Sequence, residues 1–102
     1  MKLAVFAIFD QAIEAYMKPF FAQSEGQAVR MFEDEVRNEA SPLFAHPEHY
    51  MLFRIGNYYD GEGRLEPLLP ECLRKAHEVG KKAELQEVVP ALPSFVGKQE
   101  EG

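Results

Sequence analysis

The chain begins with a stretch that is apolar on two opposite faces, and this pattern restricts the possible folds. Residues 2–9 read Lys-Leu-Ala-Val-Phe-Ala-Ile-Phe and are rich in residues that favour β-structure. Side chains alternate across a strand, which gives the two sets Leu3, Val5, Ala7 and Phe9, and Ala4, Phe6 and Ile8. Because both sets are apolar, we expect a central strand that a helix covers on one face and a partner chain covers on the other.

A helix is predicted after a capping sequence. Ser24-Glu25-Gly26-Gln27 has the capping-box pattern, in which the Ser hydroxyl and the Gln side chain satisfy backbone donors at a helix start. Apolar residues then recur at helical spacing, namely Ala28, Val29, Phe32, Val36 and Ala40. The helix should extend from about Glu25 to Glu39 and end before Pro42. We expect a loop over Leu43 to His49, because Pro42 and Pro47 interrupt regular structure.

Three further segments are predicted to be strands. Tyr16 to Gln23 should form an edge strand, or one that begins near Pro19, because proline cannot donate to a sheet. Tyr50 to Tyr58 is again apolar on both faces except for Arg54, and Arg64 to Leu68 returns as a short strand weakened by Pro67. Asp60-Gly61-Glu62-Gly63 between them has the residues of a hairpin turn. The order β-β-α-β-β predicts an α+β fold, with a small antiparallel sheet and one main helix packed on one face.

The chain divides by composition at Pro70. Residues 1–70 are predicted to form the α+β core domain, and residues 71–102 a C-terminal extension. In that extension Glu71 to Lys82 favours an amphipathic helix, followed by an extended stretch and a disordered end at residues 98–102. One helix covers only one sheet face, so the other face must meet the extension or a second subunit. We favour a homodimer, since the extension is only moderately apolar.

Charge and cysteine content restrict the classes of protein that this chain can belong to. The 102 residues carry a net charge of −6. Residues 1–70 hold 6 Lys and Arg against 11 Asp and Glu, and residues 71–102 hold 5 against 6. Neither part is basic, so any nucleic-acid binding would need a local patch. Cys72 is the only cysteine, and the apolar N-terminal run is too short to span a bilayer. We expect a reducing cytoplasm and no membrane.

No residue set has the pattern of a catalytic or metal site. His46 and His49 are three apart, whereas the helical zinc motif needs a spacing of four, and Pro47 prevents a helix there. Cys72 with His77 lacks the other parts of a nucleophilic site, and a lone cysteine on a predicted helix face is usually core filler. We therefore predict a binding protein with no catalytic residue, no metal and no cofactor.

Aromatic and basic residues on the predicted strands are the candidate contacts for nucleic acid. Aromatic rings on an exposed sheet face can stack unpaired bases, and nearby cations can bind phosphates. The candidate residues on this interpretation are Lys2, Lys18, Phe20, Arg54, Tyr58 and Arg64. The alternative is that the strand aromatics fill the core, which is their usual place.

Several short blocks, in order, carry a family resemblance over about residues 1–70. They are Lys2 to Asp10, Pro19 to Ala22, Ser24 to Phe32, His46 to Tyr50, and Leu52 to Asp60. With these blocks the chain resembles the small nonstructural protein of gokushoviruses, which are microviruses with a single-stranded DNA genome. The segment after Pro70 looks longer than is usual in that family.

The resemblance implies a role in single-stranded DNA synthesis or in the switch to packaging. It further implies action in the cytoplasm of the bacterial host and absence from the virion, and it carries over no catalytic residue. The partners expected on this interpretation are single-stranded DNA or phage or host replication proteins. The acidic balance fits a protein-mediated role better. The alternative is an adaptor or assembly factor that docks through an apolar sheet face without contacting DNA.

Overall fold

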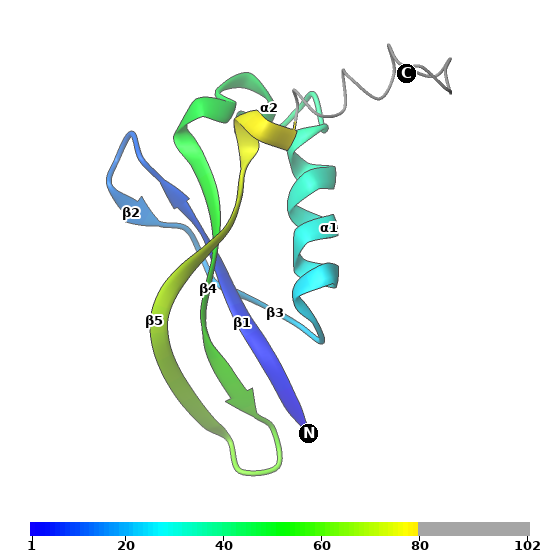
Figure 1. Cartoon of the computed structure of the whole chain (residues 1–102), viewed down its shortest axis with the longest axis vertical. Helices are drawn as coiled ribbons and strands as arrows, with labels where there is room; N and C mark the ends of the chain where they lie inside the picture. The colour runs from blue at the N-terminus through cyan, green and yellow to red at the C-terminus, as the bar shows by residue number, and fades with distance from the viewer. Residues whose placement is uncertain (80–102) are drawn as a thin grey trace, which may run out of the picture.

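The computed structural model describes residues 1–79, which form one antiparallel sheet with a helical layer on one of its faces (Figure 1). Strand β1 (Lys2–Asp10) is central and pairs with β4 (Tyr50–Tyr59) on one side. On its other side β1 pairs with two short strands, β2 (Ala15–Tyr16) and β3 (Phe20–Ala22). Strand β5 (Arg64–Lys75) lies beyond β4. The α+β class, the antiparallel sheet and the central N-terminal strand are confirmed.

The main helix, α1 (Glu25–Val36), begins where the capping sequence predicts. The Gln27 amide donates to Ser24 Oγ at 3.1 Å, and the Gln23 amide donates to Gln27 Oε1 at 2.8 Å. The helix ends three residues earlier than expected. Beyond it the Asn38 side chain accepts from the Ala40 amide at 3.0 Å, which stabilises a local turn in place of another helical turn.

The hydrophobic core lies between α1 and one face of the sheet. Phe6 from β1, Leu52 from β4 and Phe32 from α1 are all fully buried there. Phe20 stacks on Phe6 with ring centroids 5.8 Å apart. Residues 76–79 are helical, and Val79 reaches the same core. This packing holds α1 over one face, and among residues 1–79 no helix packs on the other face.

Two predictions about the middle of the chain are wrong. The expected single strand over Tyr16 to Gln23 is split around Pro19 into β2 and β3, which pair with different ends of β1. The order is therefore not β-β-α-β-β. The expected loop over Leu43 to His49 contains α2 (Pro42–Ala45) and a 3₁₀ helix, η1 (Pro47–His49). Each begins with proline at its first position, where a missing amide hydrogen costs nothing.

The prediction of a helix over Glu71 to Lys82 is wrong for its first five residues. Strand β5 continues past Pro67 and Pro70 as far as Lys75, so the boundary predicted at residue 70 falls inside a strand. An edge strand accepts proline because one side of its backbone has no partner, and the register between β4 and β5 shifts twice. The part of the extension predicted after Val79 lies outside the described residues.

Candidate interaction surface

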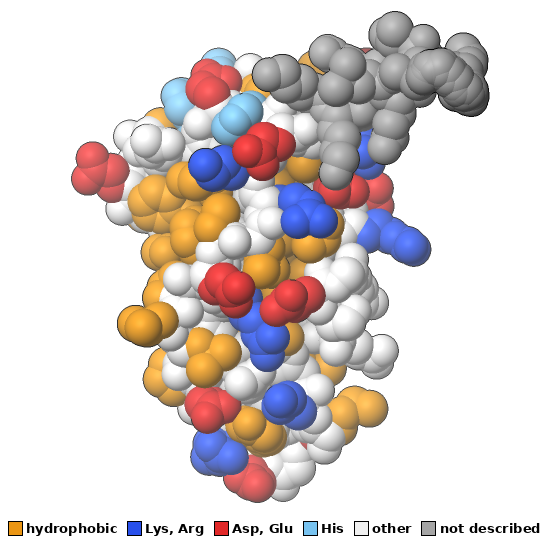
Figure 2. Space-filling view, in the orientation of Figure 1, with side chains coloured by type: hydrophobic (Ala, Val, Ile, Leu, Met, Phe, Trp, Pro, Cys, Tyr) orange, Lys and Arg blue, Asp and Glu red, His pale blue; other side chains and the backbone are white. Residues whose placement is uncertain are grey.

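The sheet face opposite α1 is apolar, and we call it the open face. Strand register places on it Leu3, Val5, Ala7 and Phe9 of β1 and their neighbours Tyr16, Phe21, Phe53, Tyr58 and Leu65. Within residues 1–79, Lys75 is the one charged strand residue that the register assigns to this face. Figure 2 shows hydrophobic side chains gathered along the side of the molecule away from α1.

Aromatic rings form a ridge at one end of the open face. Phe9, Tyr16 and Phe53 pack edge to face, with ring centroids 4.9, 5.5 and 6.2 Å apart. Tyr16 remains 44% exposed although it belongs to this cluster. The cluster is therefore ordered by its own contacts while its outer surface stays free to meet a partner.

A notch lies at the other end of the open face, nearer the N-terminus of β1. Phe21 and Leu65 stand on its two sides, 45% and 63% exposed, and Phe21 packs on Tyr58 at 5.1 Å between ring centroids. The notch has a volume of about 450 Å³ and is lined almost entirely by apolar atoms, with Val5, Ile55 and Gly56 among its residues. An apolar side chain fits this environment, whereas a phosphate does not.

A polar network occupies the opposite face of the sheet, beyond the N-terminus of α1. Arg54 donates to Glu25 Oε2 at 3.0 Å and to Asn57 Oδ1 at 2.7 Å. Asn57 and Tyr59 donate to the same oxygen of Glu66, at 2.9 and 3.0 Å. The bonds from Asn57 and then Tyr59 lower the pKa of the Glu66 carboxyl, and the bond to Glu66 raises the pKa of Tyr59.

The structure does not gather the six predicted nucleic-acid contacts on one surface. Lys2, Arg54 and Arg64 lie on the helix side of the sheet, whereas Tyr58 lies on the open face. Phe20 packs in the core, and Lys18 is exposed in the link between β2 and β3.

Two of those cations already have acidic partners. Arg54 pairs with Glu25, and the Arg64 Nε lies 2.8 Å from Glu62 Oε1 while its guanidinium covers the Tyr59 ring at 4.3 Å. A DNA phosphate would have to displace these carboxylates. The sequence-based candidate at β3 was Phe20, whereas alternation along the strand places Phe21 on the exposed face.

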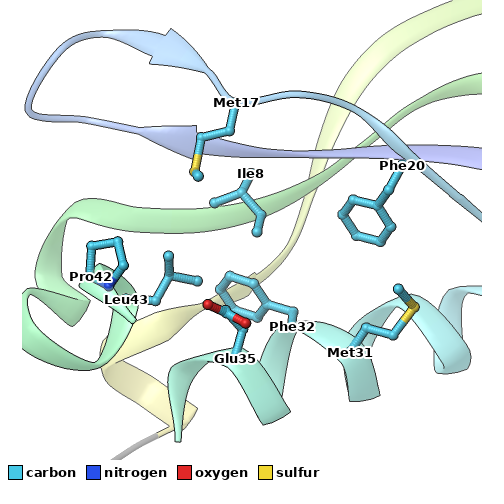
Figure 3. Close-up of a pocket in the computed structure, with 8 residues that line it drawn as sticks. All are labelled: Ile8, Met17, Phe20, Met31, Phe32, Glu35, Pro42 and Leu43. Atoms are coloured by element: carbon cyan, nitrogen blue, oxygen red, sulfur yellow. The ribbon is translucent and has the colours of Figure 1, made fainter. Parts of the chain in front are cut away.

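A second pocket lies at the sheet edge between β1, α1 and α2 (Figure 3). It has a volume of about 260 Å³, and Met17, Phe20, Met31 and Leu43 supply much of its lining. Figure 3 shows the Glu35 carboxylate beside the Phe32 ring and Leu43. It is the one ionisable side chain among the lining residues, so the pocket does not bring together the two or more polar groups that acid–base chemistry needs.

Of the predicted loop histidines and the lone cysteine, His46 and Cys72 are exposed and His49 is half-buried. His46 and His49 stack at 5.9 Å between ring centroids, and residues 1–79 contain no group of three or more metal-ligating side chains. Cys72 lies on β5 and is exposed, so its interpretation as core filler is wrong. Within the same residues, no helix has the length and apolar character needed to cross a membrane.

The fold and its surfaces define a small α+β protein with one exposed apolar sheet face. Residues 3–79 match the family model described as "Phage ORF5 protein". The chain belongs to this family and is a phage protein. Comparison with curated proteins found no match, and comparison with solved structures found none either.

Proposed function

We propose that this phage protein is non-enzymatic and acts in replication or packaging of a single-stranded DNA genome by binding another protein through its open face. The observation that carries the proposal is the open face itself, which within residues 1–79 presents the exposed side chains of Tyr16, Phe21 and Leu65 and one charged strand residue, Lys75. Contiguous exposed apolar surface of this kind is typical of protein interaction sites. The genome-related role rests on the resemblance to gokushovirus nonstructural proteins, and on the same resemblance we propose action in the host cytoplasm and not in the virion.

A protein partner fits the open face better than DNA does. Binding to a nucleic-acid backbone requires unpaired cations close to the stacking rings. The register supplies only Lys75 on that face within residues 1–79, and the net charge of the chain is −6. An apolar protein surface needs no such cations, because burial of hydrocarbon is sufficient to stabilise the contact.

Direct DNA binding is the second candidate, and the exposed rings of Tyr16 and Phe21 favour it. It is tested by fluorescence anisotropy of a short labelled single-stranded DNA, titrated with the full chain at low and at moderate salt. The protein-contact proposal predicts no saturable binding at moderate salt. Saturable binding that weakens steeply with salt, and that is lost in Arg64→Ala, would show that DNA is the ligand instead.

The open face is tested in infected cells with two matched substitutions. Phe21 on the open face and Phe44 on α2 are 45% and 48% exposed, so Glu at either position exposes the charge to water and loses a similar fraction of the packing of the ring. Phages encoding Phe21→Glu or Phe44→Glu would be compared by the amount of single-stranded genome made per infected cell. We expect a loss of ten-fold or more for Phe21→Glu and little change for Phe44→Glu. Equal genome yields would contradict the proposal.

A further inference from the structure

We infer that the partner on the open face is a second copy of this chain, packed face to face about a two-fold axis that crosses the strands at Ala7. The inference rests on the proposed function in one respect, that the open face is a contact surface. It adds the identity of the partner and the direction of the axis. Four features of the described residues support it.

The sheet edges are poorly suited to strand addition, so a second copy has to meet a face. The outer edge strand, β5, contains Pro67 and Pro70, which lack amide hydrogens, and its register with β4 shifts twice. The other edge is broken into β2 and β3 around Pro19. Neither edge offers the long row of donors and acceptors that edge-to-edge pairing requires.

The charge distribution favours contact between open faces over other self-contacts. Two copies that each carry a net charge of −6 repel one another wherever acidic surfaces meet. The register assigns no acidic strand residue to the open face within residues 1–79. Two open faces can therefore pack together while the acidic side chains stay in water.

The ridge and the notch are complementary under this symmetry. Phe9, with its neighbours Tyr16 and Met51, lies two residues beyond Ala7 along β1. Val5, with its neighbours Phe21 and Gly56, lies two residues before it. A two-fold axis across the strands at Ala7 exchanges these two levels.

The exchange sets a large side chain against a small one at two positions, and sets the Tyr16 ring against the partner's Phe21 ring at a third. Phe9 then faces the partner's Val5, and Met51 faces the partner's Gly56, which has no side chain. Facing sheets pack well when large and small side chains alternate across the interface.

The size of the face is also appropriate. Nine residues of β1 at ~3.3 Å each and four strand widths at ~4.8 Å give a flat area of about 600 Å². Side chains corrugate this surface, so the accessible area is larger and comes close to the ~800 Å² per partner of a standard stable interface.

The first test measures the mass of the full chain by sedimentation equilibrium. One chain has a mass of 11.6 kDa, so the dimer has twice that mass. We expect wild type and Phe44→Glu to sediment as dimers and Phe21→Glu to sediment as a monomer, with circular dichroism confirming that all three are folded. A monomeric wild type, or a dimeric Phe21→Glu, would overturn the inference.

The second test determines the axis with Cys72, the only cysteine of the chain. Cys72 pairs with Phe53, which pairs with Ala7, so the axis places the two Cys72 residues opposite each other. Facing sheets lie ~10 Å apart, whereas disulfides need Cα atoms within about 7 Å. The two Cys72 thiols are therefore cross-linked with a short bismaleimide and not by oxidation to a disulfide.

We expect efficient cross-linking of wild type, none of Cys72→Ser, and a loss in Phe21→Glu. An axis parallel to the strands would move the two cysteines to opposite edges. A dimeric mass without cross-linking would therefore refute the proposed axis.

Failure of this inference is distinguishable from failure of the proposed function. If the wild-type chain is monomeric and Phe21→Glu phages still lose genome yield, the open face binds a different protein. That result contradicts the inference and keeps the proposed function. If the wild-type chain is a dimer and Phe21→Glu disrupts it without changing genome yield, the inference holds and the proposed function is contradicted.

Discussion

Gly56→Ala should destabilise the protein because β5 crosses Gly56 too closely for a side chain. A Cβ atom at Gly56 would lie 2.6 Å from the backbone carbonyl oxygen of Glu66 and 3.6 Å from the Cα atom of Pro67. Carbon atoms need about 3.5 Å or more from their non-bonded neighbours, so β4 and β5 would have to separate by most of an ångström. Overpacking of this kind costs about 1–3 kcal/mol of the free energy of unfolding.

Two other glycines in the hairpin turn are controls for this reasoning. Gly61 has no atom within 4 Å of its built Cβ, so Gly61→Ala should change the free energy of unfolding by less than about 0.5 kcal/mol. Gly63 is equally unobstructed but has a φ of +63°, so Gly63→Ala should cost about 1–2 kcal/mol through backbone strain alone.

The assay is urea unfolding followed by far-ultraviolet circular dichroism at one protein concentration, because association would shift the midpoint. With a urea m value near 1–2 kcal/mol/M, Gly56→Ala should lower the midpoint by about 1 M. A Gly56→Ala midpoint equal to that of Gly61→Ala would show that β5 does not lie against Gly56 as described.

Phe32→Ala should lower the free energy of unfolding by about 3–5 kcal/mol in the same assay, because Phe32 is fully buried between α1 and the sheet. Arg54→Ala should cost about 1–3 kcal/mol, since it removes the donor to the Oδ1 atom of the buried Asn57, whose side-chain nitrogen still donates to Glu66. The lowered pKa of Glu66 means that its contribution to stability is present above about pH 4.5, the ordinary glutamate value, and is lost as the pH falls through the folded value. Glu66→Gln should therefore reduce the fall in the free energy of unfolding that wild type shows as the pH drops below about 4.5. An unchanged fall would show that Glu66 does not accept the bonds from Asn57 and Tyr59. Cys72→Ser should stay within about 0.5 kcal/mol of wild type because Cys72 is exposed, whereas a buried cysteine would show a larger loss.

Local signals in the sequence were sufficient for several elements. The capping box fixed the start of α1 at Glu25, because its hydrogen bonds join residues three and four apart. Alternating apolar residues identified β1 as a strand with two apolar faces, and the turn residues around Gly63 located the hairpin between β4 and β5. Each of these features is determined by neighbours in the chain, so it can be read without knowledge of the tertiary structure.

The errors arose where distant residues decide the structure. Residues 71–75 have a spacing compatible with a helix, but pairing with β4 holds them in a strand, and the helix begins only at Ala76. Local propensity is weaker than such tertiary pairing. The same limit applies to the candidate site. Whether Phe20 or Phe21 is exposed depends on which face α1 covers, and this follows from packing against Phe6 rather than from composition.

Two copies of the chain should cover each other's open face in solution, and hydroxyl-radical footprinting of the full chain tests this most directly. Phe21 and Phe44 have nearly the same exposed fraction in a single chain, 45% and 48%, and the same intrinsic reactivity. Oxidation of each would be measured by mass spectrometry over a range of protein concentrations. Phe21 should become several-fold less oxidised than Phe44 as the concentration rises, because the dimer covers it. Equal oxidation of the two residues at every concentration would contradict it.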